Sequence, residues 1–206
     1  VGYPKLPGVP AIGLQPDRLE GLAVGLGTFL SALHSFPVAD AVRSGVPHQR
    51  LADTIGEAHD DALENLPRIR EVAPDAPLEQ CRRFVASGVD VPATSPDVLL
   101  HNDLAAEHVL VDPSSGTITG VIDWSDVAIG HPAVDFAGLF HWGGERLAGG
   151  VLEQYEGSLD EPAMRVARYL GAWPGAMDVA FGLDRGRPEY VRAGVRALQL
   201  CTGVRS

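Results

Sequence analysis

The sequence predicts an α+β protein, mainly α, in which helices lie before and after one small cluster of strands. Apolar residues recur at helical spacing through most of the 206 residues, whereas short β-type runs gather only between residues 98 and 124. Strands and helices do not alternate, which argues against a doubly wound parallel sheet. The length suits one domain with enough chain to bury a real core.

The first part of the chain is predicted to be a connector followed by helices. Prolines at positions 4, 7, 10 and 16 make residues 1–16 an extended hinge or connector. Asp17 and Glu20 have the spacing of a capping box, so a helix is expected to begin there and to run to about residue 35. Further helices are expected at residues 38–43, from 47 to about 66 or beyond, and at about 78–86.

Short strands follow, at residues 98–100 and 108–111. Residues 112–116 have the chemistry of a turn, because Pro113 fixes its own φ and Gly116 accepts a positive φ. Residues 117–124 are therefore predicted to be the returning strand of a hairpin. After Pro132 the chain is expected to be helical again, at about 133–142, 144–157, 161–171 and 188–201.

The charge balance restricts the partners of this chain. It has 27 Asp and Glu against 16 Lys and Arg, a formal net charge of −11. Nucleic acids bind to basic surfaces, so we expect no nucleic acid partner, whereas a cationic small molecule fits the charge. Lys5 is the only lysine, so a mechanism that needs a lysine deep in the fold has no candidate here.

No membrane or targeting segment is predicted. Residues 21–39 carry no formal charge, but glycines and Pro37 interrupt them, and their leucines form one helical stripe. We expect a helix of the core, no membrane partner and a cytoplasmic location. Cys81 and Cys201 are expected to be two buried thiols rather than a disulfide.

Polar residues gather at the ends of the predicted strands. They are His101, Asn102, Asp103, Glu107, His108, Asp123, Asp126, His131 and Asp135. Carboxylates at the ends of buried strands cost solvation free energy unless a cation compensates them. A divalent metal or a charged substrate is the expected compensating group.

This segment resembles the catalytic and metal loops of protein-kinase-like phosphotransferases. Their pattern is His-x-Asp, a metal ligand five positions after that Asp, and a strand that ends in a metal-binding Asp. The chain has His101-Asn102-Asp103-Leu104, then His108, then Val121-Ile122-Asp123-Trp124. With Pro132-Ala133-Val134-Asp135 downstream, the closer resemblance is to the aminoglycoside phosphotransferase family. Residues 101–135 carry it, and a weaker compatibility extends from about residue 3 to residue 200.

The resemblance implies a kinase-like carboxy-terminal lobe in which the hairpin cluster holds the catalytic and metal loops. Asp103 would be the catalytic residue, which orients the acceptor hydroxyl and accepts its proton. His108 and Asp123 would bind Mg²⁺, which bridges the phosphates of ATP or GTP. Most members of the resembled family have Asn at the position of His108. A His there resembles the relatives that phosphorylate a double-prime hydroxyl or a macrolide. Because imidazole binds a metal only when neutral, activity should fall toward about pH 6.5; a hydrogen-bonded structural histidine is the alternative.

Four further residues have roles implied by the same resemblance. Asp126 and Glu145 are the expected substrate contacts, with an ordinary turn acid and a first-turn helix acid as the respective alternatives. His101 and Asp135 would support the catalytic loop structurally. Outside the motif, Trp142 and Trp173 are expected to pack in the core rather than to stack on a sugar. The acids Glu57, Asp60, Asp61 and Glu64 are expected to form a solvated helix face.

The resemblance also implies a second lobe. Family members have an amino-terminal, nucleotide-binding lobe with a phosphate-covering loop and a lysine. Residues 17–206 match the helical kinase-like carboxy-terminal lobe, and we expect the amino-terminal lobe to be absent from this chain. The fragment alone would then be inactive or weak.

The predicted function is transfer of the γ-phosphate of a nucleoside triphosphate to a hydroxyl of a cationic antibiotic, above all an aminoglycoside, as in antibiotic resistance. A macrolide or another small molecule is the alternative acceptor. Two hypotheses come from other classes. One is a metal-dependent hydrolase built from His101, Asp103, His108 and Asp123, which needs an open position for water. The other is a non-catalytic binding module for cationic ligands.

Overall fold

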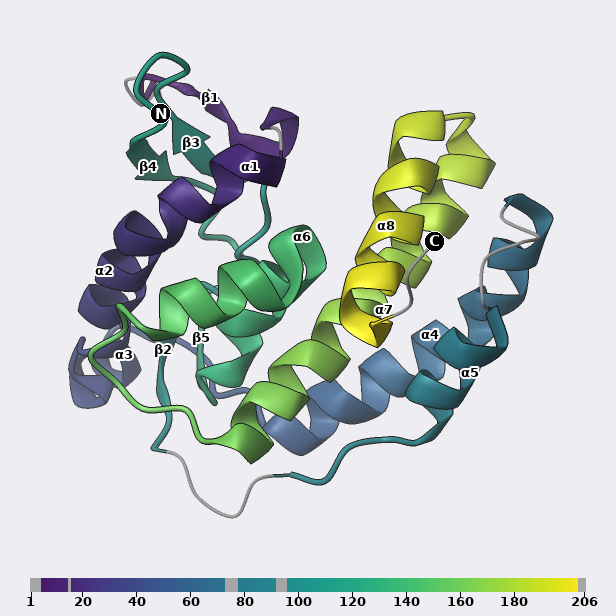
Figure 1. Cartoon of the computed structure of the whole chain (residues 1–206). Coiled ribbons are helices and arrows are strands. Elements are labelled where there is room, and N and C mark those ends of the chain that lie inside the picture. Colours follow the sequence, from purple (N-terminus) through teal and green to yellow (C-terminus); the bar gives the residue numbers. More distant parts are fainter. Residues whose placement is uncertain (1–4, 15, 73–77, 92–95, 204–206) are drawn as a thin grey trace.

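The structure, a computed structural model, describes residues 5–14, 16–72, 78–91 and 96–203. Its helices are α1 Pro16–Leu19, α2 Ala23–His34, α3 Val38–Arg43, α4 Leu51–Val72, α5 Leu78–Ala86, α6 Ala133–Leu152, α7 Glu161–Arg185 and α8 Pro188–Thr202. Its strands are β1 Val9–Pro10, β2 Val98–Leu100, β3 Val109–Val111, β4 Ile118–Val121 and β5 Ala128–Gly130. Helices therefore precede and follow one cluster of strands, which confirms the predicted mainly helical α+β class (Figure 1).

The strands of the described residues form two small antiparallel sheets. β3 and β4 make the predicted hairpin, with Val109 opposite Val121. β1 pairs with β3 at the edge of this sheet, and β2 pairs with β5. The strands β1 and β5 were not predicted, because β1 contains a proline and β5 contains an alanine and a glycine, which are residue types that strands disfavour.

The predicted connector at residues 1–16 contains ordered structure. Val9 pairs with Val111 in the sheet, and a 3-10 turn follows at Ala11–Gly13. Pro10 is tolerated in β1 because an edge strand leaves one row of N–H groups unpaired. The connector thus lies along the β3–β4 hairpin, while residues 1–4 and 15 lie outside the described part.

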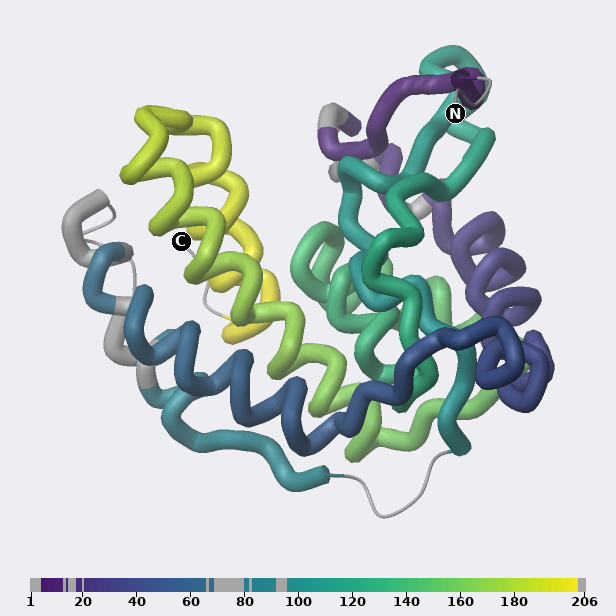
Figure 2. The backbone as a smooth tube through the Cα atoms, turned by 180° about the vertical axis from the view of Figure 1, so that it is seen from behind, coloured from purple at the N-terminus to yellow at the C-terminus, as the bar shows by residue number. Residues whose placement is uncertain are grey.

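Helix α6 occupies the middle of the fold. It packs against α2 on one side and against α7 and α8 on the other, and α4 packs against α7. Figure 2 shows the teal strands and loops lying against the green helix α6. Phe136, Leu139 and Phe140 of α6 are almost completely buried, so this helix forms the centre of the apolar core.

Two helices differ from their predicted limits. The expected break near residue 143 is a kink inside α6 at Gly144, whose φ is 66°, and α6 ends at Leu152 rather than near residue 157. α7 was expected to end near residue 171 but runs through Pro174 to Arg185, where Gly186 adopts a left-handed conformation and ends it. Packing of α7 against α4, α6 and α8 outweighs the loss of the proline N–H.

The amino-terminal helix is interrupted rather than continuous. α1 and α2 are joined by a 3-10 turn at Glu20–Leu22, within the predicted range. The side chains of Asp17 and Glu20 lie outside those described, so the capping box stays a prediction. α2 buries Leu26 and Leu30, as expected for a core helix.

Two further features concern membrane-spanning helices and the two cysteines. In the described ranges no helix combines the length and the apolar character needed to span a bilayer. Cys81 and Cys201 are both free and buried, and burial raises the pKa of the Cys201 thiol to about 12. The absence of a disulfide between these two residues is confirmed.

Candidate active site

The loop predicted to be catalytic, named the catalytic loop below, begins where strand β2 ends. Leu100 is fully buried, and the chain then turns at Asn102, whose φ of 67° lies in the left-handed region. A non-glycine residue keeps such a conformation only where its surroundings hold it. Asp103 follows directly, and its side chain is 45% exposed, so the turn presents this carboxylate at the surface.

Asp135, in the first turn of α6, accepts hydrogen bonds from the backbone of the turn at Asn102. The backbone N–H of His101 donates to one of its carboxylate oxygens at 3.0 Å, and that of Asn102 donates to the other at 2.8 Å. Asp135 is completely buried, so both bonds form in a low-dielectric interior, where they are strong. The structure therefore places Asp135 where it determines the backbone on the amino-terminal side of Asp103.

His101 joins the catalytic loop to the loop that follows β4. Its Nε2 donates to the carbonyl oxygen of Ile122 at 2.9 Å, one residue before Asp123. Its buried ring lies 4.7 Å from the ring of Trp124, centroid to centroid. His101 thus couples the positions of Asp103 and Asp123 without being exposed to a substrate.

Asp123 is the second carboxylate of the site. It has a φ of 62°, and the hydroxyl of Ser125 donates to its Oδ1 at 2.8 Å. This hydrogen bond is the main cause that lowers the pKa of Asp123 below its ordinary value. Asp123 is therefore a carboxylate at neutral pH, ready to face a cation.

His108 lies between the two aspartates. Its Nδ1 donates to the backbone carbonyl of Asp103 at 2.9 Å and lies 3.3 Å from the Asp103 carboxylate. Its Nε2 lies 3.6 Å from Oδ2 of Asp123. With the hydrogen on Nδ1, the lone pair of Nε2 points toward the Asp123 side, which is the orientation that a metal-binding imidazole needs.

The pair of His108 and Asp123 fits a Mg²⁺ ion that is completed by water and phosphate. Two donor atoms 3.6 Å apart can both contact one ion at about 2.1 Å. Around this pair, as elsewhere in the described residues, no group of three His, Cys, Asp or Glu is arranged to hold a metal.

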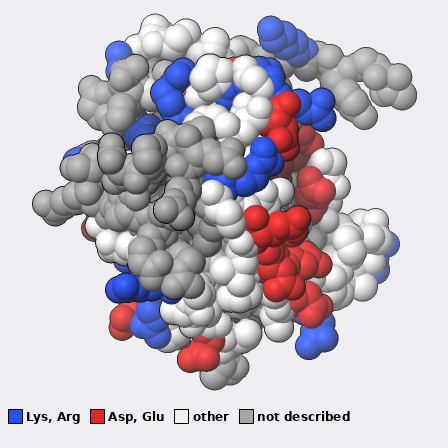
Figure 3. Space-filling model, turned by 90° about the vertical axis from the view of Figure 1, so that its right-hand side faces the viewer, with Lys and Arg blue, Asp and Glu red and all other residues white. Residues whose placement is uncertain are grey.

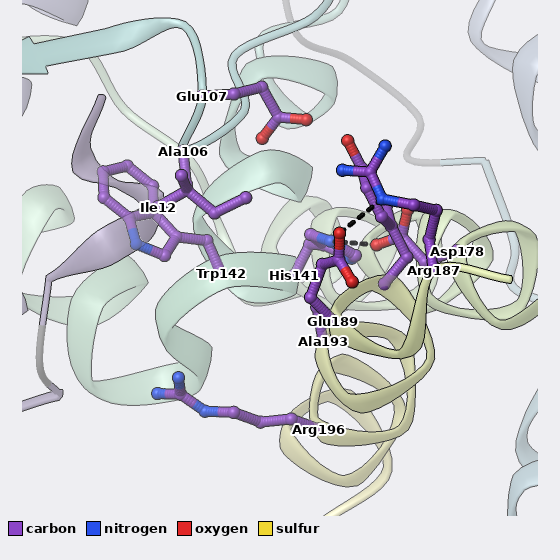
Figure 4. A pocket seen from close by; sticks show the side chains of 11 residues that line it. Ile12, Ala106, Glu107, His141, Trp142, Asp178, Arg187, Glu189, Ala193 and Arg196 are labelled. Carbon is purple, nitrogen blue, oxygen red and sulfur yellow. Dashed lines mark hydrogen bonds and ion pairs between the residues drawn. The ribbon is translucent and has the colours of Figure 1, made fainter. Parts of the chain in front are cut away.

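A cleft adjoins the catalytic loop. A cavity of about 200 Å³ is lined by Asp103 together with residues of α4, α6 and α7. A larger cavity of about 450 Å³ lies between the loop and helices α7 and α8 (Figure 4). Glu107, His141 and Asp178 line both, so the two cavities are neighbouring parts of one cleft that leads away from Asp103.

The walls of the larger cavity are rich in charge. Figure 4 shows Glu107 from the loop, Asp178 from α7 and Glu189 from α8 around the space. Asp178 lies 3.3 Å from Nε2 of His141, and Glu189 accepts a hydrogen bond from Arg187 at 2.5 Å. Arg187 and Arg196 line the same cavity, so its three carboxylates face two guanidinium groups, and one of these, Arg187, is paired with Glu189.

The two tryptophans of interest belong to both the core and the cleft. Trp142 is only 7% exposed, as expected for a core residue, yet it also lines the larger cavity. Trp173 packs against the core and lines the smaller cavity. An apolar wall beside the carboxylates suits a substrate with both a ring framework and charged groups.

The two acids predicted to contact the substrate lie outside the cleft. Asp126 is exposed on the loop after β4, where its backbone carbonyl accepts a hydrogen bond from the Asn102 side chain. Glu145 is exposed beyond the kink at Gly144. Neither residue lines either cavity, so the geometry does not support Glu145 as a contact and leaves Asp126 on the side of the metal loop.

Sequence reasoning did not single out three of the residues that line the cleft. His141, Asp178 and Glu189 come from three different helices and share no motif. Each is an isolated polar residue on an amphipathic helix, a pattern typical of solvent-exposed positions. Only the packing of α6, α7 and α8 brings them together.

An exposed aspartate on a tight turn, a neighbouring His–Asp pair and an adjoining cleft are the features expected of a kinase-like phosphotransferase. The sequence profile of the Phosphotransferase enzyme family matches residues 2–170. The chain belongs to this family, which confirms the resemblance found in residues 101–135.

Two curated proteins illustrate the relationship. Viomycin phosphotransferase of Streptomyces vinaceus is 29% identical over 153 residues, which cover 72% of this chain and 52% of that protein. The uncharacterized protein YcbJ of Bacillus subtilis is 26% identical over 213 residues, covering 96% of this chain and 68% of that protein. The chain thus spans about half the length of the viomycin phosphotransferase.

Solved structures show the same fold. The GDP complex of aminoglycoside 2'-phosphotransferase-IIIa matches with a TM-score of 0.67 and 24% identity, covering 98% of this chain and 69% of that one. Macrolide 2'-phosphotransferase type I matches with a TM-score of 0.56 and 26% identity, covering 95% and 68%. These likenesses confirm the predicted kinase-like fold.

Proposed function

We propose that this chain forms the catalytic and acceptor-binding lobe of an antibiotic phosphotransferase. The reaction would transfer the γ-phosphate of ATP or GTP to a hydroxyl of a cationic antibiotic, with an aminoglycoside as the first candidate. The observation that carries the proposal is the shared histidine: Asp103 and Asp123 lie 3.3 and 3.6 Å from the two ring nitrogens of His108. Both carboxylates thus converge on one point beside a cleft.

The proposed role of Asp103 follows from its place at the cleft. An acceptor hydroxyl in the smaller cavity can donate a hydrogen bond to this carboxylate, which orients the oxygen for attack and accepts its proton. Asp135 and His101 hold the turn, so the carboxylate is positioned before the substrate binds. Catalysis would depend mainly on this positioning and on charge neutralisation.

His108 and Asp123 are proposed to hold the metal. Mg²⁺ supplies neutralisation of the phosphate charges when it is bound. The backbone carbonyl of Asp103 fixes the tautomer of His108, and Ser125 keeps Asp123 ionised. The metal ligands are therefore oriented by the same loop that carries the catalytic carboxylate.

The acceptor is proposed to be cationic because acids outnumber bases along its proposed route to the site. Glu107, Asp178 and Glu189 line the larger cavity together with Arg187 and Arg196. Figure 3 shows acidic side chains gathered in a band on the side of the molecule where α4 and α5 lie. Among the four acids expected to form a solvated face of α4, Glu57, Asp60 and Glu64 are exposed and Asp61 is half-buried. With a net charge of −11, this field accelerates the approach of cations.

The test uses the full-length protein that carries this sequence. Labelled ATP and GTP are offered with kanamycin, viomycin or a macrolide, and phosphate transfer to each acceptor is measured. Asp103→Asn should lower kcat by about 10³-fold, because it removes the proton acceptor and leaves the cleft intact. Glu145→Gln serves as a matched control, since this exposed acid lines neither cavity.

The outcomes separate the candidate functions. Transfer to kanamycin supports the aminoglycoside, and transfer only to a macrolide or viomycin assigns the alternative acceptor. Acceptor binding without transfer from either nucleotide contradicts the enzyme and supports a binding module. We also propose a cytoplasmic location, because ATP and GTP are cytoplasmic metabolites.

A further inference from the structure

A second histidine lies behind the catalytic loop. His34, the last residue of α2, is 8% exposed, and its Nε2 lies 3.0 Å from Oδ2 of Asp135. Its Nδ1 lies 2.7 Å from the hydroxyl of Tyr155, in the turn after α6. Neither His34 nor Tyr155 lines the cleft described above, so neither is placed to touch a substrate.

The direction of these hydrogen bonds follows from their chemistry. Both oxygens of Asp135 accept from backbone N–H groups, so the carboxylate acts as an acceptor and Nε2 of His34 donates to it. Burial and the nearby charge of Asp135 raise the pKa of Tyr155 to about 12. The Tyr155 hydroxyl therefore keeps its proton and can donate to Nδ1 of a neutral His34.

This series of bonds ends at the catalytic turn. Oδ2 of Asp135 accepts from both His34 and the N–H of His101, while Oδ1 accepts from the N–H of Asn102. Rotation of the carboxylate would break at least one of the two backbone bonds. Asn102 would then lose the contact that holds it in the left-handed conformation, next to Asp103.

We propose that His34 is a positioning residue: it holds the Asp135 carboxylate in the orientation that places Asp103, and Tyr155 in turn orients the His34 ring. The inference rests on the proposed function, because its kinetic consequence is a slower phosphoryl transfer. Its structural consequence, a fixed catalytic turn, does not depend on the identity of the substrate.

The fold contains a matched control pair. His59 of α4 and Tyr169 of α7 form a histidine–tyrosine hydrogen bond of 2.8 Å, and the Tyr169 hydroxyl also donates to the carbonyl of Val85. Neither residue lines the cleft. Tyr169→Phe therefore removes the same atom as Tyr155→Phe, without a link to the catalytic turn.

The first experiment is steady-state kinetics of the full-length protein. His34→Leu should lower kcat about 10- to 100-fold while the KM for the acceptor changes less than about twofold, because the cleft walls are untouched. Tyr155→Phe should lower kcat by less, and His34→Gln should recover part of the loss because its amide can still donate to Asp135. Tyr169→Phe should leave kcat unchanged. Equal losses in Tyr155→Phe and Tyr169→Phe, or no recovery with Gln, would overturn the inference.

The second experiment needs no activity. The amide hydrogens of His101 and Asn102 both donate to Asp135, so their exchange with solvent reports the turn directly. His34→Leu and Tyr155→Phe should each speed this exchange, by about tenfold for His34→Leu, whereas Tyr169→Phe should not. If the wild-type protein transfers phosphate to no acceptor, the proposed function fails, but exchange still decides the positioning role. Unchanged exchange at both amides would refute it.

Discussion

Replacing Asp135 with Asn tests how strongly the catalytic turn depends on one buried carboxylate. The two side chains have nearly the same shape, so the substitution changes hydrogen bonding and charge while it preserves packing. In the wild type, one oxygen accepts from His101 and His34, and the other accepts from Asn102. In the variant, the amide oxygen can keep the first pair, but the NH₂ group must then face the N–H of Asn102.

The cost can be worked from this geometry. One buried N–H group loses its acceptor, which costs about 1–3 kcal/mol, and the two retained bonds lose the assistance of the negative charge. A total of about 2–4 kcal/mol follows, which for a chain of this length lowers the Tm by roughly 5–15 °C. The same misplaced turn should also lower kcat, because Asp103 follows Asn102 directly.

Chemical denaturation measured by circular dichroism checks the stability, and phosphoryl transfer checks the rate. Asp53→Asn is the control, since the Asp53 side chain is 60% exposed and should change stability by less than about 0.5 kcal/mol. If Asp135→Asn is as stable as this control, the carboxylate does not hold the turn and the argument from buried hydrogen bonds is refuted.

Three further predictions concern packing, the cleft and alkaline pH. Gly138→Ala should destabilise the fold and lower kcat, because a Cβ there would stand 2.0 Å from the carbonyl oxygen of Leu104 in the catalytic loop; thermal unfolding and kinetics check both effects. Asp178→Asn and Glu189→Gln should each raise the KM for a cationic acceptor about 3- to 10-fold with little change in kcat, and the effect should weaken in high salt. The raised pKa of Tyr155 stabilises the fold fully below about pH 10, and this contribution is lost as the pH rises to about 12. Unfolding free energies of wild type and Tyr155→Phe should therefore converge as the pH rises through this window.

Each of these predictions has a result that contradicts it. A Gly138→Ala variant with wild-type stability would mean that α6 does not contact the catalytic loop this closely. Unchanged KM values in both cleft variants, matching Glu145→Gln, would place the acceptor elsewhere. A constant stability difference between wild type and Tyr155→Phe across the alkaline window would show that the Tyr155 hydroxyl is accessible to water.

Much of the fold could be predicted because local signals mark where its elements begin and end. The limits of α3, α5 and β2 agree with the predicted ranges 38–43, 78–86 and 98–100. Proline and glycine near these ends restrict the backbone whatever surrounds it. The far end of α7 was not predictable in this way, since Pro174 breaks an isolated helix but is tolerated where three neighbouring helices pack around it.

In the candidate site too, the residues that could be predicted are those that local signals position. Asp103, His108, Asp123 and Asp135 lie within one short segment, in which strand ends and turns determine where each side chain points. Their order and spacing therefore sufficed to predict that they would lie together. The sequence also determined the class of the fold, the acidic charge of its surface and the state of both cysteines.

Only the tertiary structure decided which residues line the cleft and support the turn. Asp178 and Glu189 reach the cleft through the packing of α7 and α8 beside the loop. His34 meets Asp135 across 101 positions of the chain. Contacts over such separations depend on how whole helices pack, and a helical surface position carries no local mark of the neighbour that packing will bring to it.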